Sequence, residues 1–261
     1  MVGSGVVSAN EPGQPPIDGG AWSSALPTPG VALAIGAHPD DVEFGAGGTL
    51  ATWASNGCTV HHLVCTDGSK GTWDVNADLP ALVARRRDEQ RDASRRLSGE
   101  RAGEVRFLGA VDGELEPSVG HRIEIVRAIR ELRPDVVLGH DPWKRYRLHP
   151  DHRAAGLLTC DAIVAARDPH FFPGVGPAHH RPAHLLLFEA DEPDHVEDVT
   201  GSVERKLDAL HAHESQFEST MHAADAAELD AFDQRITERL RELGGPHGVE
   251  LAEVFKRISD L

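Results

Sequence analysis

Short apolar runs separated by helical patterns constrain the fold of this chain more than any other feature. Each run is six to nine residues long and rich in Val, Leu and Ile, as expected of strands buried on both faces. The stretches between the runs carry helical patterns, and alternation of this kind is typical of a parallel sheet covered by helices on both sides. The predicted strands are residues 31–37, 58–66, 104–109, 135–140 and 184–189, and the predicted helices are residues 45–56, 78–97, 119–132, 152–166, 202–213 and 224–243.

These elements predict an α/β, Rossmann-like three-layer domain with a mainly parallel central sheet. The chain has 261 residues, and we expect residues 31–261 to form a single domain. Residues 1–30 are rich in Gly, Pro and Ser and lack periodicity, which predicts a flexible N-terminal arm. Residues 168–182 form a long irregular connection, for which a rim of the active site and a merely mobile loop are the two interpretations.

Charge and cysteine content exclude several classes of partner. Lys and Arg number 26 against 42 Asp and Glu, for a net charge of −16, which argues against binding along nucleic acid or anionic lipid. No apolar stretch approaches the roughly 18–20 residues of a membrane-spanning helix, and the first residues lack a signal-peptide pattern. Three cysteines without a C-x-x-C pair fit a reducing compartment. We therefore predict a cytoplasmic protein that binds neither nucleic acid nor membrane.

Two polar clusters follow predicted strands. HPDD (38–41) comes directly after the first strand, and HPDH (149–152) comes shortly after the strand that ends at His140. Ligands of open parallel sheets bind beyond the carboxyl ends of the strands, so the clusters converge if these strands are neighbours. A catalytic zinc typically takes three N or O ligands and activates a water in the open position. A metal site is predicted here, although each cluster alone could be a solvated turn or a helix cap.

Longer motifs around these clusters carry a family resemblance. AHPDDVEFGAGGTLA (37–51) and HPDHRAAG (149–156) are the main matches, and TDGSKGTWD (66–74), FLGAVDGEL (107–115) and KLDALHAHESQF (206–217) are weaker ones. With these motifs the chain resembles the PIG-L/LmbE-like zinc-dependent N-acetylglucosaminyl deacetylases. Many members have Glu directly after the two aspartates, whereas this chain has Val42 before Glu43, a variant that also occurs in the family.

The resemblance implies roles for eight residues. In that assignment Asp40 is the general base for the metal-bound water, and His149 stabilises the oxyanion and protonates the leaving amine. Asp151 would orient His149 by a hydrogen bond. The implied ion is Zn²⁺, with Fe²⁺ as the alternative. The implied residues are His38, Asp41 and His152 as metal ligands, Asp40, His149 and Asp151 as catalytic residues, and Arg86 and Asp112 as substrate contacts.

The implied reaction removes an N-acetyl group from a GlcNAc-type sugar conjugate, and family members are often homo-oligomers. A zinc amidase that acts on a non-sugar amide or thiol conjugate would use the same site behind a different rim. A non-catalytic nucleotide-binding domain would use Gly45–Gly48, but Leu50 replaces the third glycine of G-x-G-x-x-G. A metal phosphoesterase usually needs more carboxylates, for a two-metal site.

Overall fold

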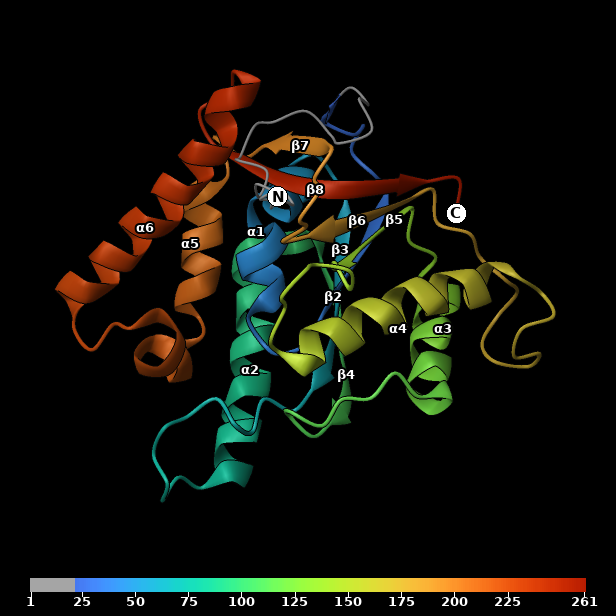
Figure 1. Ribbon diagram of the computed structural model, residues 1–261, viewed down its shortest axis with the longest axis horizontal. Coiled ribbons are helices and arrows are strands. Elements are labelled where there is room, and N and C mark those ends of the chain that lie inside the picture. Colours follow the sequence, from blue (N-terminus) through green and yellow to red (C-terminus); the bar gives the residue numbers. More distant parts are fainter. Residues whose placement is uncertain (1–21) are drawn as a thin grey trace, which may run out of the picture.

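The computed structural model describes residues 22–261. The predicted α/β class is confirmed (Figure 1). The strands are β1 (Ser23–Ser24), β2 (Val31–Gly36), β3 (Thr59–Thr66), β4 (Ala102–Ala110), β5 (Val136–His140), β6 (His184–Phe188), β7 (His195–Asp198) and β8 (Ala252–Ser259). The α-helices are α1 (Asp41–Ser55), α2 (Leu79–Ser98), α3 (Val119–Leu132), α4 (Pro150–Arg167), α5 (Val203–His211) and α6 (Ala226–Gly244). Short turns of other helix types are η1 (Gly99–Arg101), η2 (Glu214–Gln216), η3 (Phe217–Met221) and η4 (Gly245–His247).

The strands form one sheet in the order β1-β7-β8-β6-β5-β2-β3-β4. The five predicted strands are β2 to β6, and all of them run parallel. The strand β8 runs antiparallel between β6 and β7, and neither β7 nor β8 was predicted. Both lie toward one side of the sheet and mix charged with apolar residues, so they lack the apolar run that marks a doubly buried strand.

Helices cover both faces of the sheet (Figure 1). Leu33 and Ile35 of β2 pack with α3 and α4 in one core, whereas Ala32 and Ala34 pack with α1, α2 and α5 in the other. This alternation is the two-residue period of a strand, with apolar side chains on both faces because both are covered. The result is the predicted three-layer arrangement.

The predicted arm extends less far than residue 30. Residues 1–21 of it lie outside the described residues. Residues 22–30 lie against the sheet, because β1 pairs with β7 and Leu26 is buried. The Leu26 backbone N–H donates to a carboxylate oxygen of Glu197 at 2.8 Å. The folded domain therefore begins before Val31, the residue at which the sequence pattern had predicted its start.

The glycine-rich start of α1 serves helix packing. A Cβ atom at Gly45 would lie 2.5 Å from the Phe188 ring, and one at Gly48 would lie 2.7 Å from Cβ of Val199. Non-bonded carbon atoms cannot approach so closely. Glycine at these positions therefore allows α1 to pack directly against Phe188 of β6 and against Val199, which follows β7. These contacts explain the glycines without a bound nucleotide.

The irregular loop 168–182 is not a rim of the site. It begins at the carboxyl end of α4, whereas the predicted metal and catalytic residues lie at the amino end of that helix. One buried side chain, Arg130 of α3, holds the loop against the end of α4 by donating to six carbonyl oxygens, four in the loop and two in α4. The acceptors are the backbone oxygens of Ala165, Ala166, Asp168, Phe171, Phe172 and Val175.

Within residues 22–261, no helix combines the length and the apolar character that crossing a bilayer requires.

Candidate metal and catalytic site

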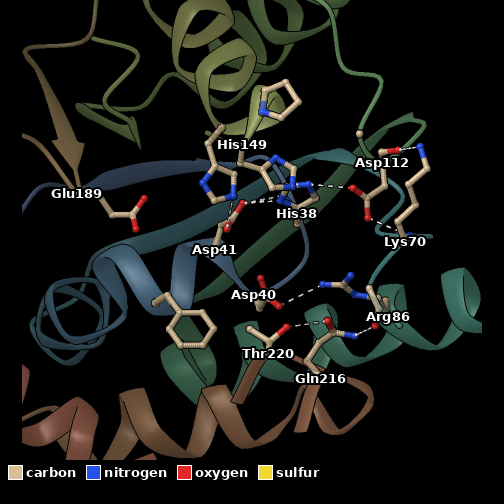
Figure 2. A pocket seen from close by; sticks show the side chains of 15 residues that line it. His38, Asp40, Asp41, Lys70, Arg86, Asp112, His149, Glu189, Gln216 and Thr220 are labelled. Atoms are coloured by element: carbon tan, nitrogen blue, oxygen red, sulfur yellow. Dashed lines mark hydrogen bonds and ion pairs between the residues drawn. The ribbon is translucent and has the colours of Figure 1, made fainter. Parts of the chain in front are cut away.

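The site lies where the order of the strands reverses. The chain runs from β2 to β3 and β4 on one side, then returns to β5 and β6 on the other side of β2. Ligands of open α/β sheets bind at this position, beyond the carboxyl ends of the two central strands. A cavity of about 560 Å³ opens here (Figure 2). Its lining consists of His38, Asp40, Asp41, Phe44, Lys70, Gly71, Arg86, Asp112, Gly113, His149, Pro150, His152, Glu189, Gln216 and Thr220.

Asp41 joins the two predicted clusters. Its Oδ1 lies 3.4 Å from Nε2 of His152, and its Oδ2 lies 3.4 Å from Nδ1 of His38. The rings of His38 and His152 have centroids 5.2 Å apart. His140, at the end of β5, adds a third ring, with Nε2 3.1 Å from Oδ2 of Asp41. The structure therefore brings the predicted ligands together and adds His140 to them.

Three overlapping groups of side chains could hold a metal ion, and one of them consists of His38, Asp112, His149 and Asp151. His38 and His152 share a second group with His149, and Asp41 and His152 share a third with His140. In each group one donor atom per residue lies within 4.8 Å of the others. A set of imidazole and carboxylate donors suits a first-row divalent cation such as zinc.

The electrostatics of the site favour a bound cation. Burial alone lowers the pKa of His38, but hydrogen bonds with Asp112, Asp151 and Asp41 outweigh it and raise the pKa to about 12. Burial and the charge of His140 lower the pKa of His152 to about 4, despite Asp41, so this ring is neutral. Burial raises the pKa of Asp41, but the charge of His140 and hydrogen bonds with His140 and His38 hold it well below its usual range. The carboxylates of Asp112, Asp151 and Asp41 stabilise positive charge at this place, which is why His38 holds its proton. A divalent cation would be stabilised there in the same way.

Asp40 lies beside this cluster in an unusual backbone conformation. Its φ is 108°, in the left-handed region, which costs a non-glycine residue about 1–3 kcal/mol. Its Oδ2 accepts a hydrogen bond from Nη2 of Arg86 at 3.1 Å. Burial raises the pKa of Asp40 to about 6, while the charge of Arg86 opposes that shift. The carboxylate is therefore more basic than an exposed aspartate, as a general base requires.

Asp151 contacts a different histidine from the one expected. Its Oδ2 lies 3.1 Å from Nε2 of His38 and accepts from the backbone N–H of Gly113 at 2.6 Å. No hydrogen bond joins Asp151 to His149 among the described residues. His149 is exposed at the cavity, with its ring centroid 4.6 Å from that of His38. Burial and the charge of His38 lower the pKa of His149.

The two predicted substrate contacts differ in how freely they face the cavity. Arg86 is 3% exposed and is engaged by protein atoms, since it donates to the backbone oxygens of Pro39 and Gly68 as well as to Asp40. Asp112 lies 3.2 Å from Nε2 of His38 through Oδ1 and accepts from the backbone N–H of Lys70 through Oδ2. Both line the cavity, and Arg86 also fixes the loop that carries Asp40.

Several residues of the site were not predicted. Arg147 donates through Nη1 to Glu189 at 2.8 Å and contacts Nδ1 of His140 and of His152 at 3.2 and 3.1 Å. Glu189 directly follows β6, so its place at a carboxyl strand end could have marked it as a candidate. Lys70 lies inside the TDGSKGTWD motif, but no sequence signal separated it from its neighbours. Gln90 of α2 accepts a hydrogen bond from the backbone N–H of Asp40, and neither Gln90 nor Arg147 lies in a recognisable sequence motif.

The sequence of this chain is similar to a known protein family and to deacetylases from other organisms. The family described as GlcNAc-PI de-N-acetylase, PIG-L, matches residues 33–163. The diacetylchitobiose deacetylase of Thermococcus kodakarensis is 36% identical over 198 residues, which are 71% of this chain and 69% of that protein. The 1D-myo-inositol 2-acetamido-2-deoxy-alpha-D-glucopyranoside deacetylase of Rhodococcus jostii is 34% identical over 164 residues, 51% of this chain and 53% of its own length.

A solved structure agrees with these sequence matches. The N,N'-diacetylchitobiose deacetylase from Pyrococcus horikoshii, in complex with an inhibitor, superposes with a TM-score of 0.78 at 28% identity and covers 88% of this chain and 84% of its own. The fold and the His/Asp cluster thus define a deacetylase-type α/β protein with a candidate metal site. The chain belongs to the PIG-L family, as its motifs predicted.

Proposed function

We propose that this protein is a zinc-dependent hydrolase that removes the N-acetyl group from a small GlcNAc-containing conjugate. One observation carries the proposal: a buried Asp40 with a raised pKa lies beside a His/Asp cluster, and both open into one cavity. The named activities of the relatives from Thermococcus kodakarensis and Rhodococcus jostii supply the substrate class. A cytoplasmic location and a homo-oligomeric state stay predictions.

In this proposal His38, Asp41 and His152 hold the ion. A bound zinc would act as a Lewis acid and lower the pKa of a coordinated water to about 7. Asp41 is ionised and His152 neutral, the protonation states that metal ligation needs, whereas His38 carries a proton that binding of the ion would release from Nδ1. Asp151 and Asp112 hold the His38 ring through its Nε2.

Two side chains move protons. The Asp40 carboxylate takes a proton from the attacking water, whose oxygen bonds to the acetyl carbon. His149 donates a proton to the sugar nitrogen as the carbon–nitrogen bond breaks, so the products are acetate and the free amine. Its lowered pKa makes the protonated ring a readier donor. Asp112 and Arg86, which line the same cavity, are the proposed contacts for sugar hydroxyls.

A substrate panel tests the class of amide. We expect acetate release from N,N'-diacetylchitobiose or a GlcNAc–inositol conjugate with a kcat/KM at least about 100-fold above that for acyclic N-acetyl amides. A site built to hydrogen-bond hydroxyl groups rejects analogues that lack them by such factors or more. Preference for an N-acetylated thiol conjugate or a non-sugar amide would instead identify the amidase alternative. The measurement is acetate released, determined enzymatically, at matched substrate concentrations.

A further inference from the structure

The main chain of Asp40 is held by a side chain from another helix. Its buried N–H donates to Oε1 of Gln90 at 3.0 Å. A buried N–H without an acceptor is costly, so this hydrogen bond favours the observed backbone conformation. Because φ of Asp40 lies in the left-handed region, relaxation of the backbone would turn its carboxylate to a new direction. The Gln90 amide is therefore in a position to control where Asp40 points.

Glu43 determines which end of the Gln90 amide faces Asp40. Gln90 is 0% exposed, and its Nε2 donates to Oε1 of Glu43 at 2.7 Å. An ionised carboxylate only accepts hydrogen bonds, so the amide must turn its NH₂ group toward Glu43 and its oxygen toward the Asp40 N–H. Asp40 and Glu43 are three positions apart at the start of α1, while Gln90 is on α2.

Two buried histidines lie behind Glu43. Nε2 of His62, from β3, lies 3.5 Å from one Glu43 oxygen, and Nε2 of His213, next to η2, lies 3.4 Å from the other. All three side chains are fully buried. A buried carboxylate needs polar groups beside it, and the two imidazole rings lie at ion-pair distance from Glu43 without forming hydrogen bonds to it.

Arg86 completes the arrangement from the same helix face. It lies four residues before Gln90, one helical turn, and donates to the Pro39 oxygen at 2.6 Å and to the Asp40 carboxylate. The loop that carries Asp40 is thus fixed by α2 at two points. One of these points, Arg86, lines the cavity, whereas Gln90 is not among the lining residues.

We propose that Gln90, oriented by Glu43, is a positioning residue that holds the Asp40 carboxylate toward the reacting water. The inference rests on the proposed function, in which Asp40 is the general base. Gln90 touches neither substrate nor metal in this account and acts only through Asp40. A misplacement of about 1 Å in a catalytic group can cost about 100-fold in rate, so the effect should appear in kcat.

The first test replaces Gln90 in the zinc-loaded full chain. Gln90→Met removes both hydrogen bonds with little change of volume, and we expect kcat to fall about 10- to 100-fold. We expect KM within twofold and an unchanged zinc content by elemental analysis, because neither the cavity wall nor the ligands change. Ser94→Ala is the matched control, since Ser94 is buried one turn further along α2 and its Oγ has no hydrogen-bond partner within residues 22–261. A kcat within twofold of the parent in a folded Gln90→Met protein would overturn the proposal, as would a loss of zinc equal to the loss of kcat.

A paired exchange tests the role of amide orientation. Gln90→Glu alone sets two carboxylates against each other and should lower kcat at least about tenfold. In the double variant Glu43→Gln/Gln90→Glu, the new amide at position 43 can donate to the carboxylate at position 90, which still accepts from the Asp40 N–H. We expect kcat of the double variant to be at least threefold higher than kcat of Gln90→Glu. A double variant without this recovery would show that Glu43 does not orient Gln90.

The failure of this inference can be told from the failure of the proposed function. Asp40→Asn is measured beside these variants. If Asp40→Asn is inactive while Gln90→Met is fully active, only the positioning role fails. If Asp40→Asn is fully active, the general base itself is wrong. A crystal structure of Gln90→Met gives a direct readout, and an unchanged φ at Asp40 would count against the role of Gln90.

Discussion

Asp40→Asn should bind a full equivalent of zinc and lose about 10²- to 10⁴-fold in kcat, the range typical of a removed general base. The amide keeps the volume of the carboxylate and an oxygen that accepts from Arg86, so the loop should keep its shape. Arg86 also retains its bonds to the Pro39 and Gly68 carbonyls, which prevents a buried guanidinium from being left unpaired. What the variant lacks is a basic oxygen to take the proton from water.

The measurement is kcat by acetate release together with zinc content and thermal unfolding. Asp135→Asn is the control, because Asp135 accepts from the backbone N–H groups of Gly30 and Val31 just before β5, away from the site. We expect this control to retain its activity. Full activity in Asp40→Asn would exclude Asp40 as the base and redirect attention to the other carboxylates that line the cavity.

His152→Ala should lose metal as well as activity. The ring is neutral, as a ligand must be, and lies against Asp41. Removing even an outer-shell partner of a metal ligand typically lowers affinity 10- to 100-fold, so we expect loss of a ligand to lower zinc affinity at least about 100-fold. Competition with a chelator of known affinity measures this loss.

Two further histidine variants make that result specific. His121→Ala, on α3 and outside the set of residues that line the cavity, should leave zinc affinity unchanged. His140→Ala addresses the overlapping group formed by Asp41, His140 and His152. If His152→Ala keeps stoichiometric zinc while His140→Ala loses it, the ligand set assigned by the family motifs is wrong.

The core of the fold could be predicted because its strands are buried on both faces. Strands β2 to β6 show up as apolar runs, and α3 was predicted with both ends correct. The start of α1 was placed at Gly45, four residues late, because the helix begins at Asp41 inside the polar motif. The strand β8 was missed, since AEVFKRIS alternates too irregularly to indicate either a strand or a helix.

The site could be predicted as a set of residues but not as a network of contacts. Local motifs place His38, Asp41 and His152 at neighbouring strand ends, and the structure brings them together. Asp151 reaches His38 across 113 positions of sequence, and Gln90 reaches Asp40 across 50. Such contacts depend on how the helices pack against the sheet, and a local sequence pattern does not determine that packing. For this reason neither the contact between Asp151 and His38 nor the role of Gln90 was predicted.

The central claim is that this chain hydrolyses the N-acetyl group of a GlcNAc conjugate and needs a metal ion to do so. The most direct measurement is acetate release from N,N'-diacetylchitobiose by wild-type protein before chelation, after chelation, and after stepwise return of zinc, with metal content determined at each point. We predict that activity falls with the metal and returns in proportion to zinc up to about one equivalent per chain. Undiminished acetate release from protein shown to be free of metal would contradict the account.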